Sequence, residues 1–147
     1  MDDRDAETSI GLPLEAGQSF SRVVWFDDSS ISKFATLVGD SNFLHHDRTA
    51  ALETRFGGLI ASGTHVSSVL AAMVATALSQ LRPSLGLEIS FRFRRAVRAN
   101  TKMVARWELT SIKFSNRLGG HLVVFTGELL NSDGEQAVAG KVVSVVT

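Results

Sequence analysis

The sequence of 147 residues contains no cysteine, so the chain can form neither a disulfide bond nor a cysteine-ligated metal site. An excess of either charge is absent too, because 15 Lys and Arg residues balance 15 Asp and Glu residues. A balanced chain has no general attraction to nucleic acid or to an anionic membrane surface, and we expect neither as a partner. The lack of cysteine fits a reducing compartment, so a cytoplasmic location is expected.

Charge is also absent from one long segment, residues 56–81, which contains no Asp, Glu, Lys or Arg. A membrane-spanning helix needs about twenty predominantly apolar residues. The front of this segment carries three glycines, and serine, threonine and glutamine interrupt the remainder. We therefore expect a helix that is buried within a globular protein.

The length of the chain indicates one domain over residues 1–147. The acidic start, MDDRDAETS, lacks the apolar stretch of a secretory signal. Residues 1–15 are therefore expected to be a solvated, flexible tail.

The first half of the chain predicts helices. Oxygen-bearing Asp-Ser-Ser residues precede a helix expected over 31–38, and Gly39 is placed to end it. A second, short helix is expected over 47–55. The charge-free helix is expected over 64–81, where apolar residues recur at helical spacing and Pro83 stops the helix.

The second half predicts strands. In LEISFRFRR at 87–95, apolar residues alternate strictly with polar ones, which is typical of a half-buried strand. The alternation continues over 103–109, and two more strands are expected over 122–130 and 137–146, joined by the turn sequence NSDG. Helices followed by four successive strands indicate an α+β domain, in which an antiparallel sheet curls around the apolar helix.

Proton-transferring side chains are gathered in one loop, GDSNFLHHD at 39–47, which holds two of the chain's 4 histidines. Three interpretations are open: a metal site, an acid–base pair, or a polar turn between two helices. Adjacent side chains of an extended loop point apart, and the His-x-x-x-His or Glu-x-x-His spacing of helical metal ligands is missing. We therefore favour acid–base chemistry and predict no metal.

Together with FGGLIASGTHVSSVL at 56–70, this loop resembles the MaoC-like family of hot-dog proteins, whose best-understood members are (R)-specific enoyl-CoA hydratases. The family pattern is roughly Gly-Asp-x-Asn-Pro-x-His-x-Asp, followed by Phe-Gly-x-x-Ile-Ala-His-Gly. The residues that match it are Gly39, Asp40, Asn42, His45, Asp47, Phe56, Gly57, Ile60, Ala61 and Gly63. The resemblance implies a hot-dog fold and a role in fatty acid metabolism as a hydro-lyase that hydrates or dehydrates an acyl-CoA.

The resemblance assigns the catalytic pair to Asp40 and His45, and the local chemistry agrees with this assignment. Adding water across a double bond conjugated to a thioester needs a base that deprotonates water and an acid that protonates the α-carbon. We expect Asp40 to be the principal base and His45 to be its water-holding partner and proton donor, although the two roles can be exchanged. Asn42 is expected to tie down the loop backbone through its side-chain amide.

The third chemical requirement is a donor to the enolate-like oxygen. Ser62 and Gly63 start the buried helix, where backbone N–H groups lack intrahelical acceptors, and Gly63 leaves room for the thioester. We expect the Gly63 N–H to be this donor, supported by Ser62; the alternative is that the two residues only cap the helix. The resemblance aligns Ser68 with a family serine that hydrogen-bonds the catalytic aspartate.

The chain departs from the family pattern at three places. Phe43 stands where the family has proline, Ser62 replaces the histidine before the glycine, and residues 64–65 replace two large apolar residues. These departures are expected to narrow the acyl pocket. The candidate substrate-binding residues are Phe43, Gly58, Ile60, Arg92 and Arg94.

Basic and imidazole side chains outside the pair have less specific interpretations. The arginines at positions 92, 94, 95 and 98 either grip coenzyme A phosphates or form the solvated face of a strand. His46 is expected to face solvent or to form a pocket wall. His65 is expected to be a satisfied core histidine, and His121 to be exposed.

Two other functions remain open: a hot-dog acyl-CoA thioesterase, and a non-catalytic protein that binds acyl-CoA. The Asp-x-x-x-x-His pairing favours the hydratase. No cofactor is expected beyond the acyl-CoA thioester as substrate. A single sheet leaves edge strands, so a homodimer or higher oligomer is expected, and the resemblance places the acyl-CoA channel at the subunit interface.

Overall fold

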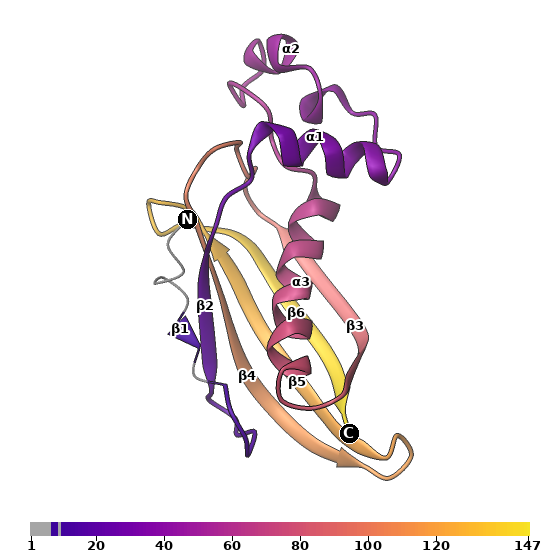
Figure 1. Ribbon diagram of the computed structural model, residues 1–147. Helices are drawn as coiled ribbons and strands as arrows, with labels where there is room; N and C mark the ends of the chain where they lie inside the picture. The colour runs from indigo at the N-terminus through magenta and orange to yellow at the C-terminus, as the bar shows by residue number, and fades with distance from the viewer. Residues whose placement is uncertain (1–6, 9) are drawn as a thin grey trace.

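The computed structural model describes residues 7–8 and 10–147, and it shows one antiparallel sheet packed against a long helix (Figure 1). The strands follow the order β1-β2-β4-β5-β6-β3 across the sheet. Their bounds are Glu7–Thr8 for β1, Ser19–Val24 for β2, Ser84–Phe93 for β3, Met103–Ser115 for β4, Gly120–Leu130 for β5 and Gln136–Val146 for β6. The predicted α+β hot-dog fold, with four long strands in the second half, is confirmed.

The helices are α1 (Asp28–Leu37), the 3-10 helix η2 (Phe43–His45), α2 (Arg48–Leu52) and α3 (Gly63–Ser79). The central helix α3 lies along the sheet, while α1 and α2 sit together beyond one end of it, next to the start of α3 (Figure 1). The helix expected over 64–81 therefore begins one residue earlier and ends two residues earlier. None of the helices in the described ranges, 7–8 and 10–147, combines the length and the apolar character that a membrane span requires.

The helix α3 buries one side only. Its sheet-facing stripe is fully apolar, with Val66, Leu70, Met73, Val74 and Leu78 buried. The opposite stripe is exposed and consists of small residues: Thr64, Ser68, Ala72, Ala75, Thr76 and Ser79. The sheet of one chain therefore covers the apolar stripe of α3 and leaves the stripe of small residues open.

Strand β3 is also more open than its sequence predicts. It lies at the edge of the sheet beside β6, and Leu85, Ile89 and Phe93 are 65%, 56% and 51% exposed. Strict alternation correctly predicts the strand, but it does not say which surface covers the apolar face. Phe91 of that face packs on Trp107, while Leu85 and Ile89 remain open to solvent.

The segment before β2 is partly packed against the core. Ile10 is buried, and Leu14 packs against the hydrophobic cluster. The flexible tail expected over 1–15 therefore does not include residues 10 and 14, whereas residues 1–6 and 9 lie outside the described residues.

One row of residues across the sheet shows how the core is filled. Phe20 pairs with Trp107, Trp107 with Gly127, Gly127 with Gly140, and Gly140 with Phe91. The ring of Trp107 lies over the two glycines and is 1% exposed, with Phe91 packed edge-on against it. The glycines are required here because a β-carbon on either of them would overlap an aromatic ring.

Gly127→Ala is expected to destabilise the protein by about 1–3 kcal/mol, the usual cost of adding a methyl group to a filled core. The measurement is urea unfolding followed by circular dichroism. Gly11→Ala is the control, because a β-carbon at Gly11 meets nothing within 4 Å. Equal stability of the two variants would contradict this account of the core.

Candidate active site

The C-terminus of α1 places Asp40. Gly39 adopts a positive φ of 77°, which glycine reaches without a steric penalty. The Gly39 N–H donates to the Thr36 carbonyl at 3.1 Å, and the Asp40 N–H donates to the Ala35 carbonyl at 2.8 Å. These two bonds form a Schellman motif, which ends the helix and fixes the backbone of Asp40 directly after it.

The short helix η2 places His45. The Asn42 side-chain oxygen accepts the Leu44 N–H at 3.1 Å, and the Asp40 Oδ1 accepts the Asn42 N–H at 3.0 Å. Asn42 therefore fixes the loop backbone between the two candidate catalytic residues. The loop is tied to the segment before α3 by the Ile60 N–H, which donates to the Leu44 carbonyl at 3.1 Å.

Asp40 and His45 face each other. His45 is 5% exposed, and its Nε2 lies 3.5 Å from Asp40 Oδ2. Its Nδ1 lies 2.7 Å from the Ile60 carbonyl oxygen, which can only accept a hydrogen bond. Nδ1 therefore carries a hydrogen in either protonation state, and Nε2 is the atom that can exchange a proton with a water or a substrate.

His46 has a different environment from the one expected. It is half-buried, and both of its ring nitrogens are bonded: Nδ1 lies 2.9 Å from Ser32 Oγ, and Nε2 lies 2.7 Å from the Asp40 carbonyl oxygen. The expectation of a solvent-facing or pocket-wall residue is therefore wrong. A loop histidine finds such partners only through the folded loop, which the sequence pattern does not specify.

The two adjacent histidines point to different partners, as expected for neighbouring residues. Among the described residues no group of three or more His, Asp or Glu side chains is placed to hold a metal ion. The loop brings one carboxylate and one imidazole face to face, those of Asp40 and His45.

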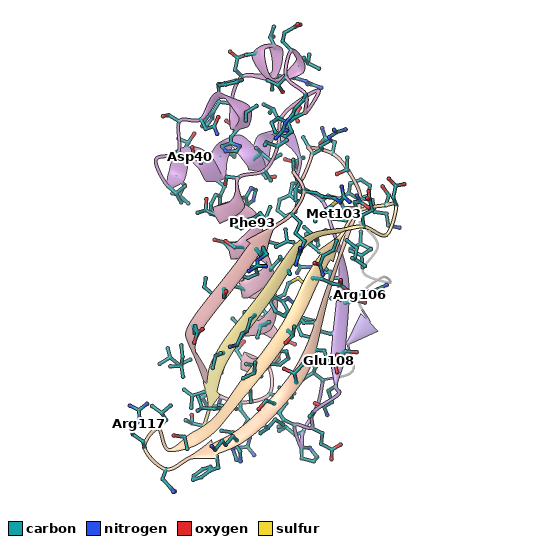
Figure 2. All side chains as sticks on the ribbon, turned by 180° about the vertical axis from the view of Figure 1, so that it is seen from behind. Asp40, Phe93, Met103, Arg106, Glu108 and Arg117 are labelled. Atoms are coloured by element: carbon teal, nitrogen blue, oxygen red, sulfur yellow. The ribbon has the colours of Figure 1, made fainter. Side chains whose placement is uncertain are left out.

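Gly63 lies beside a cavity of about 290 Å³ at the start of α3. The lining residues include Ile60, Gly63, Phe93 and Arg94. The Phe93 ring lies against Gly63, where a β-carbon would come within 3.0 Å of it. Figure 2 shows Asp40 and Phe93 at the same end of the molecule, with Phe93 where β3 reaches the start of α3. Ile60 connects the two places, because its side chain belongs to this cavity and its carbonyl accepts from His45.

Ser62 caps α3 and is buried. Its Oγ accepts the His65 N–H at 3.2 Å and also contacts Thr64 Oγ1 at 3.1 Å. The first-turn N–H of Gly63 has no acceptor within the helix and lies at the positive end of the helix dipole. This N–H can therefore donate to an oxygen atom of a ligand in the neighbouring cavity.

Arginines surround a second cavity, of about 550 Å³, next to the first. Its basic lining residues are Arg55, Arg94, Arg95 and Arg98, and Asp133 and Glu135 are its acidic ones. Arg95 pairs with Glu135 at 2.6 Å, so its charge is partly compensated. Arg92 is exposed and lines neither cavity. Arg55 lines both cavities but was not predicted, because it stands just before Phe56, outside the matched motif.

Three other predicted site residues lie apart from the pair in this chain. Ser68 is exposed, and within the described ranges no hydrogen bond joins it to Asp40. Phe43 is 48% exposed at the start of η2, and neither Phe43 nor Gly58 lines the cavity beside Gly63. Within the described part of one chain, Phe43 therefore makes no contact with the cavity that would support the expected narrowing of the acyl pocket.

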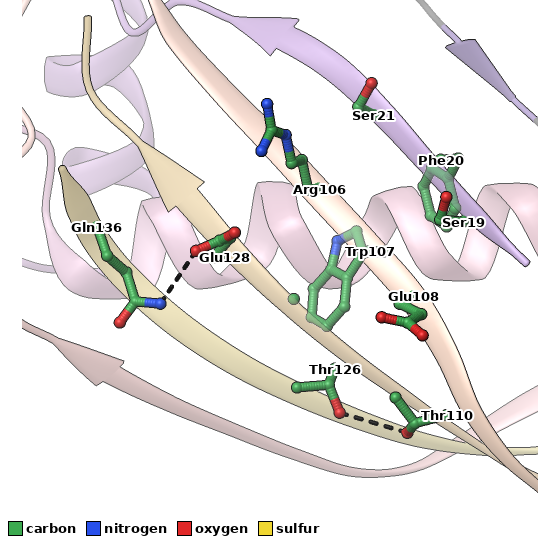
Figure 3. A pocket seen from close by; sticks show the side chains of 11 residues that line it. Ser19, Phe20, Ser21, Arg106, Trp107, Glu108, Thr110, Thr126, Glu128 and Gln136 are labelled. Atoms are coloured by element: carbon green, nitrogen blue, oxygen red, sulfur yellow. Dashed lines mark hydrogen bonds between the residues drawn. The ribbon is translucent and has the colours of Figure 1, made fainter. Parts of the chain in front are cut away.

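Another hollow, of about 700 Å³, lies on the outer face of the sheet (Figure 3). It is lined by polar side chains of β2, β4, β5 and β6, with α3 on the far side of the strands. The Glu128 carboxylate accepts from Gln136 and Thr110 contacts Thr126, so these groups bond to one another. Neither Asp40 nor His45 lines this hollow.

His65 packs between two phenylalanine rings near the pair. Its ring stacks on Phe34 with centroids 4.5 Å apart and meets Phe26 edge-on at 5.0 Å. It is 7% exposed, and its Nδ1 has no hydrogen-bond partner, so the expectation of a satisfied core histidine is wrong. Desolvation first, and then the proximity of His45, lower the pKa of His65 below its ordinary value of 6.5. A neutral His65 adds no positive charge beside His45.

His65→Phe is expected to stabilise the protein, by about 1 kcal/mol, because it removes a buried unpaired nitrogen. Since the folded pKa of His65 is depressed, the unfolded chain binds the proton more readily, and wild-type stability falls as the pH drops below about 6.5. The gap between variant and wild type should therefore widen from about pH 7.5 to about pH 5 in urea unfolding. His121→Phe, which replaces an exposed histidine, should show no such widening; a constant gap for His65→Phe would contradict the prediction.

Known proteins resemble this chain in sequence and in structure. The family described as MaoC like domain matches residues 5–126. Nodulation protein N from Rhizobium leguminosarum bv. viciae is 30% identical over 125 residues, which cover 80% of this chain and 76% of that protein.

Two similar solved structures are hydratases. The R-hydratase PhaJ1 from Pseudomonas aeruginosa is 26% identical with a TM-score of 0.80, covering 90% of this chain and 82% of that chain. An (R)-hydratase from A. caviae, involved in PHA biosynthesis, is 24% identical with a TM-score of 0.80, covering 93% of this chain and 100% of that chain. The second likeness carries the fold alone.

Proposed function

The chain belongs to the MaoC-like dehydratase family, and from this we propose that it hydrates a trans-2-enoyl-CoA to the (R)-3-hydroxyacyl-CoA, or catalyses the reverse dehydration. The observation that carries the proposal is the position of Asp40 Oδ2 3.5 Å from His45 Nε2. The (R) configuration and the thioester substrate are inferred from the likeness to the R-hydratase PhaJ1.

The pair can carry both proton transfers of the reaction. Asp40 accepts a proton from water as the water oxygen bonds to the β-carbon, and the electron pair of the double bond moves through the α-carbon toward the thioester oxygen. His45 gives its Nε2 proton to the α-carbon, which forms the new C–H bond and restores the thioester. The proton on Asp40 then returns to His45, so one water molecule has been added and both groups are restored. If the two roles are exchanged, His45 takes the proton from water and a protonated Asp40 gives its proton to the α-carbon.

The start of α3 supplies the hydrogen-bond donor to the thioester oxygen. Charge develops on the thioester oxygen between the two proton transfers, and a backbone N–H aimed at it lowers the barrier. We assign this donor to Gly63, which lines the cavity and whose lack of a side chain admits the Phe93 ring beside it. The arginines of the neighbouring cavity, Arg94 and Arg55 among them, are suited to the phosphates of coenzyme A.

Asp40→Asn and His45→Gln are each expected to lower hydratase turnover by roughly a hundredfold or more, the scale for removing a positioned acid or base. Hydration is measured as the loss of crotonyl-CoA absorbance, with release of free thiol followed in parallel. His121→Gln is the control, because His121 is exposed and contacts Phe114. Thiol release without loss of the double bond would indicate a thioesterase instead, and neither signal would indicate a protein that only binds acyl-CoA.

We propose that the protein is a homodimer, because two surfaces of the single chain are left without cover. The exposed stripe of α3 and the open apolar face of β3 border one groove of about 430 Å³, whose lining includes Ala72, Ala75 and Ile89. An apolar edge strand beside a small-residue helix face is suited to a second copy of the same surfaces.

Ile89→Asp is expected to shift the protein from a dimer to a 15.9 kDa monomer in light scattering at micromolar concentration, because it places a charge in the open apolar face. Leu37→Asp is the matched control: Leu37 is also an exposed apolar residue, but it lies on α1. A wild-type protein that scatters as a monomer would rule out the dimer, and a dimeric Ile89→Asp variant would place its interface elsewhere.

A further inference from the structure

His46 is the one histidine of the loop that the proposed proton transfers do not use, yet both of its nitrogens have partners. The Asp40 carbonyl, 2.7 Å from Nε2, can only accept, so Nε2 carries the hydrogen. In the neutral ring Nδ1 is then an acceptor, and the Ser32 hydroxyl, 2.9 Å away, donates to it. One tautomer is thereby selected, and Ser32 holds the ring from the side of α1.

We propose that His46 is a positioning residue that acts through the backbone of Asp40; this inference rests on the proposed function. The backbone of Asp40 is held at both ends, its N–H by the Ala35 carbonyl at 2.8 Å and its C=O by His46 at 2.7 Å. His46 touches neither the Asp40 carboxylate nor His45 Nε2. It fixes the peptide group from which the carboxylate extends.

The two adjacent histidines attach the loop to two different parts of the chain. His45 binds the Ile60 carbonyl in the segment that leads into α3, while His46 binds Ser32 of α1 and the carbonyl of Asp40 after that helix. Because they are consecutive residues, a shift of one part relative to the other strains the bonds of both. The distance of 3.5 Å between Asp40 and His45 is set by this double attachment.

The bond from His46 is not needed to end α1, because the Schellman bonds of Gly39 and Asp40 already do so. Asp40 is only partly buried, so its carbonyl can turn to solvent when His46 is replaced. Such a turn rotates the peptide and displaces the carboxylate, and a misplacement of about 1 Å can cost on the order of a hundredfold in rate. The effect of losing His46 should therefore appear in turnover and not in stability.

Three substitutions of His46 distinguish its bond to the Asp40 carbonyl from its bond to Ser32. The side-chain nitrogen of Gln reaches the place of Nε2, that of Asn reaches only the place of Nδ1, and Leu replaces neither. We expect His46→Gln to keep kcat within about threefold, and His46→Asn and His46→Leu to lose roughly tenfold or more, with KM nearly unchanged. If His46 acted only through Ser32 and α1, His46→Asn would keep a higher kcat than His46→Gln. That result would overturn the proposal, and so would a wild-type kcat in all three variants.

A second readout does not depend on activity. The Asn42 N–H donates to Asp40 Oδ1 at 3.0 Å, so its amide resonance in NMR reports the place of the carboxylate. The resonance should stay in His46→Gln and move in His46→Asn; an unmoved resonance in both would contradict the inference even if the Leu variant did not fold.

Asp40→Asn in the same assay distinguishes a failure of the positioning role of His46 from a failure of the proposed hydratase function. An inactive Asp40→Asn together with a fully active His46→Asn would overturn the positioning role alone. A fully active Asp40→Asn would overturn the proposed function, and the role of His46 in catalysis with it.

Discussion

The site depends on the hydrogen bond from His45 Nδ1 to the Ile60 carbonyl, 2.7 Å long. It ties the loop after α1 to the segment before α3, and these are the two parts of the chain that carry the proposed chemistry. It also fixes the hydrogen of the ring on Nδ1, which leaves Nε2 turned toward Asp40. This bond orients the imidazole, and together with the bond from the Ile60 N–H to the Leu44 carbonyl it holds the loop next to the segment that leads to Gly63.

Local backbone motifs supply the rest of the arrangement. A glycine at positive φ ends α1 and delivers Asp40, Asn42 caps η2 and delivers His45, and Ser62 caps α3 and leaves the Gly63 N–H open. Each is a terminus of a helix, where backbone groups lack partners inside the helix. The candidate active site is therefore assembled from three helix ends within 24 residues of sequence, 40 to 63.

The sequence predicts the elements well, because apolar periodicity and capping residues are local properties. The helix 64–81 and three of the four strands lie within three residues of their predicted bounds, whereas β4 continues to Ser115, beyond the predicted 103–109. Asp40 and His45 face each other as expected for an acid–base pair. The exposure of β3 was not predictable in the same way, since alternation shows that a face is apolar and not which chain covers it. The bonds of His46 and the unpaired Nδ1 of His65 depend on how α1 packs over the loop, which no short motif specifies.

The single chain presents a site with one open side. The exposed stripe of α3, the apolar face of β3 and Ser68 all lie away from the chain's own core. A second copy covering these surfaces would enclose the groove beside α3 and could supply contacts for Phe43 that one chain does not provide. This account explains why α3 carries no charged residue on any side although only one stripe is buried.

The central claim is that Asp40 and His45 act on one face of the substrate, and hydration of crotonyl-CoA in heavy water tests it most directly. A carboxylate oxygen and an imidazole nitrogen only 3.5 Å apart must deliver the hydroxyl and the α-proton from the same side. The account predicts a 3-hydroxybutyryl product with one deuterium at the α-carbon, as a single syn diastereomer in proton NMR. Anti addition, an equal mixture of diastereomers, or no hydration at all would contradict it.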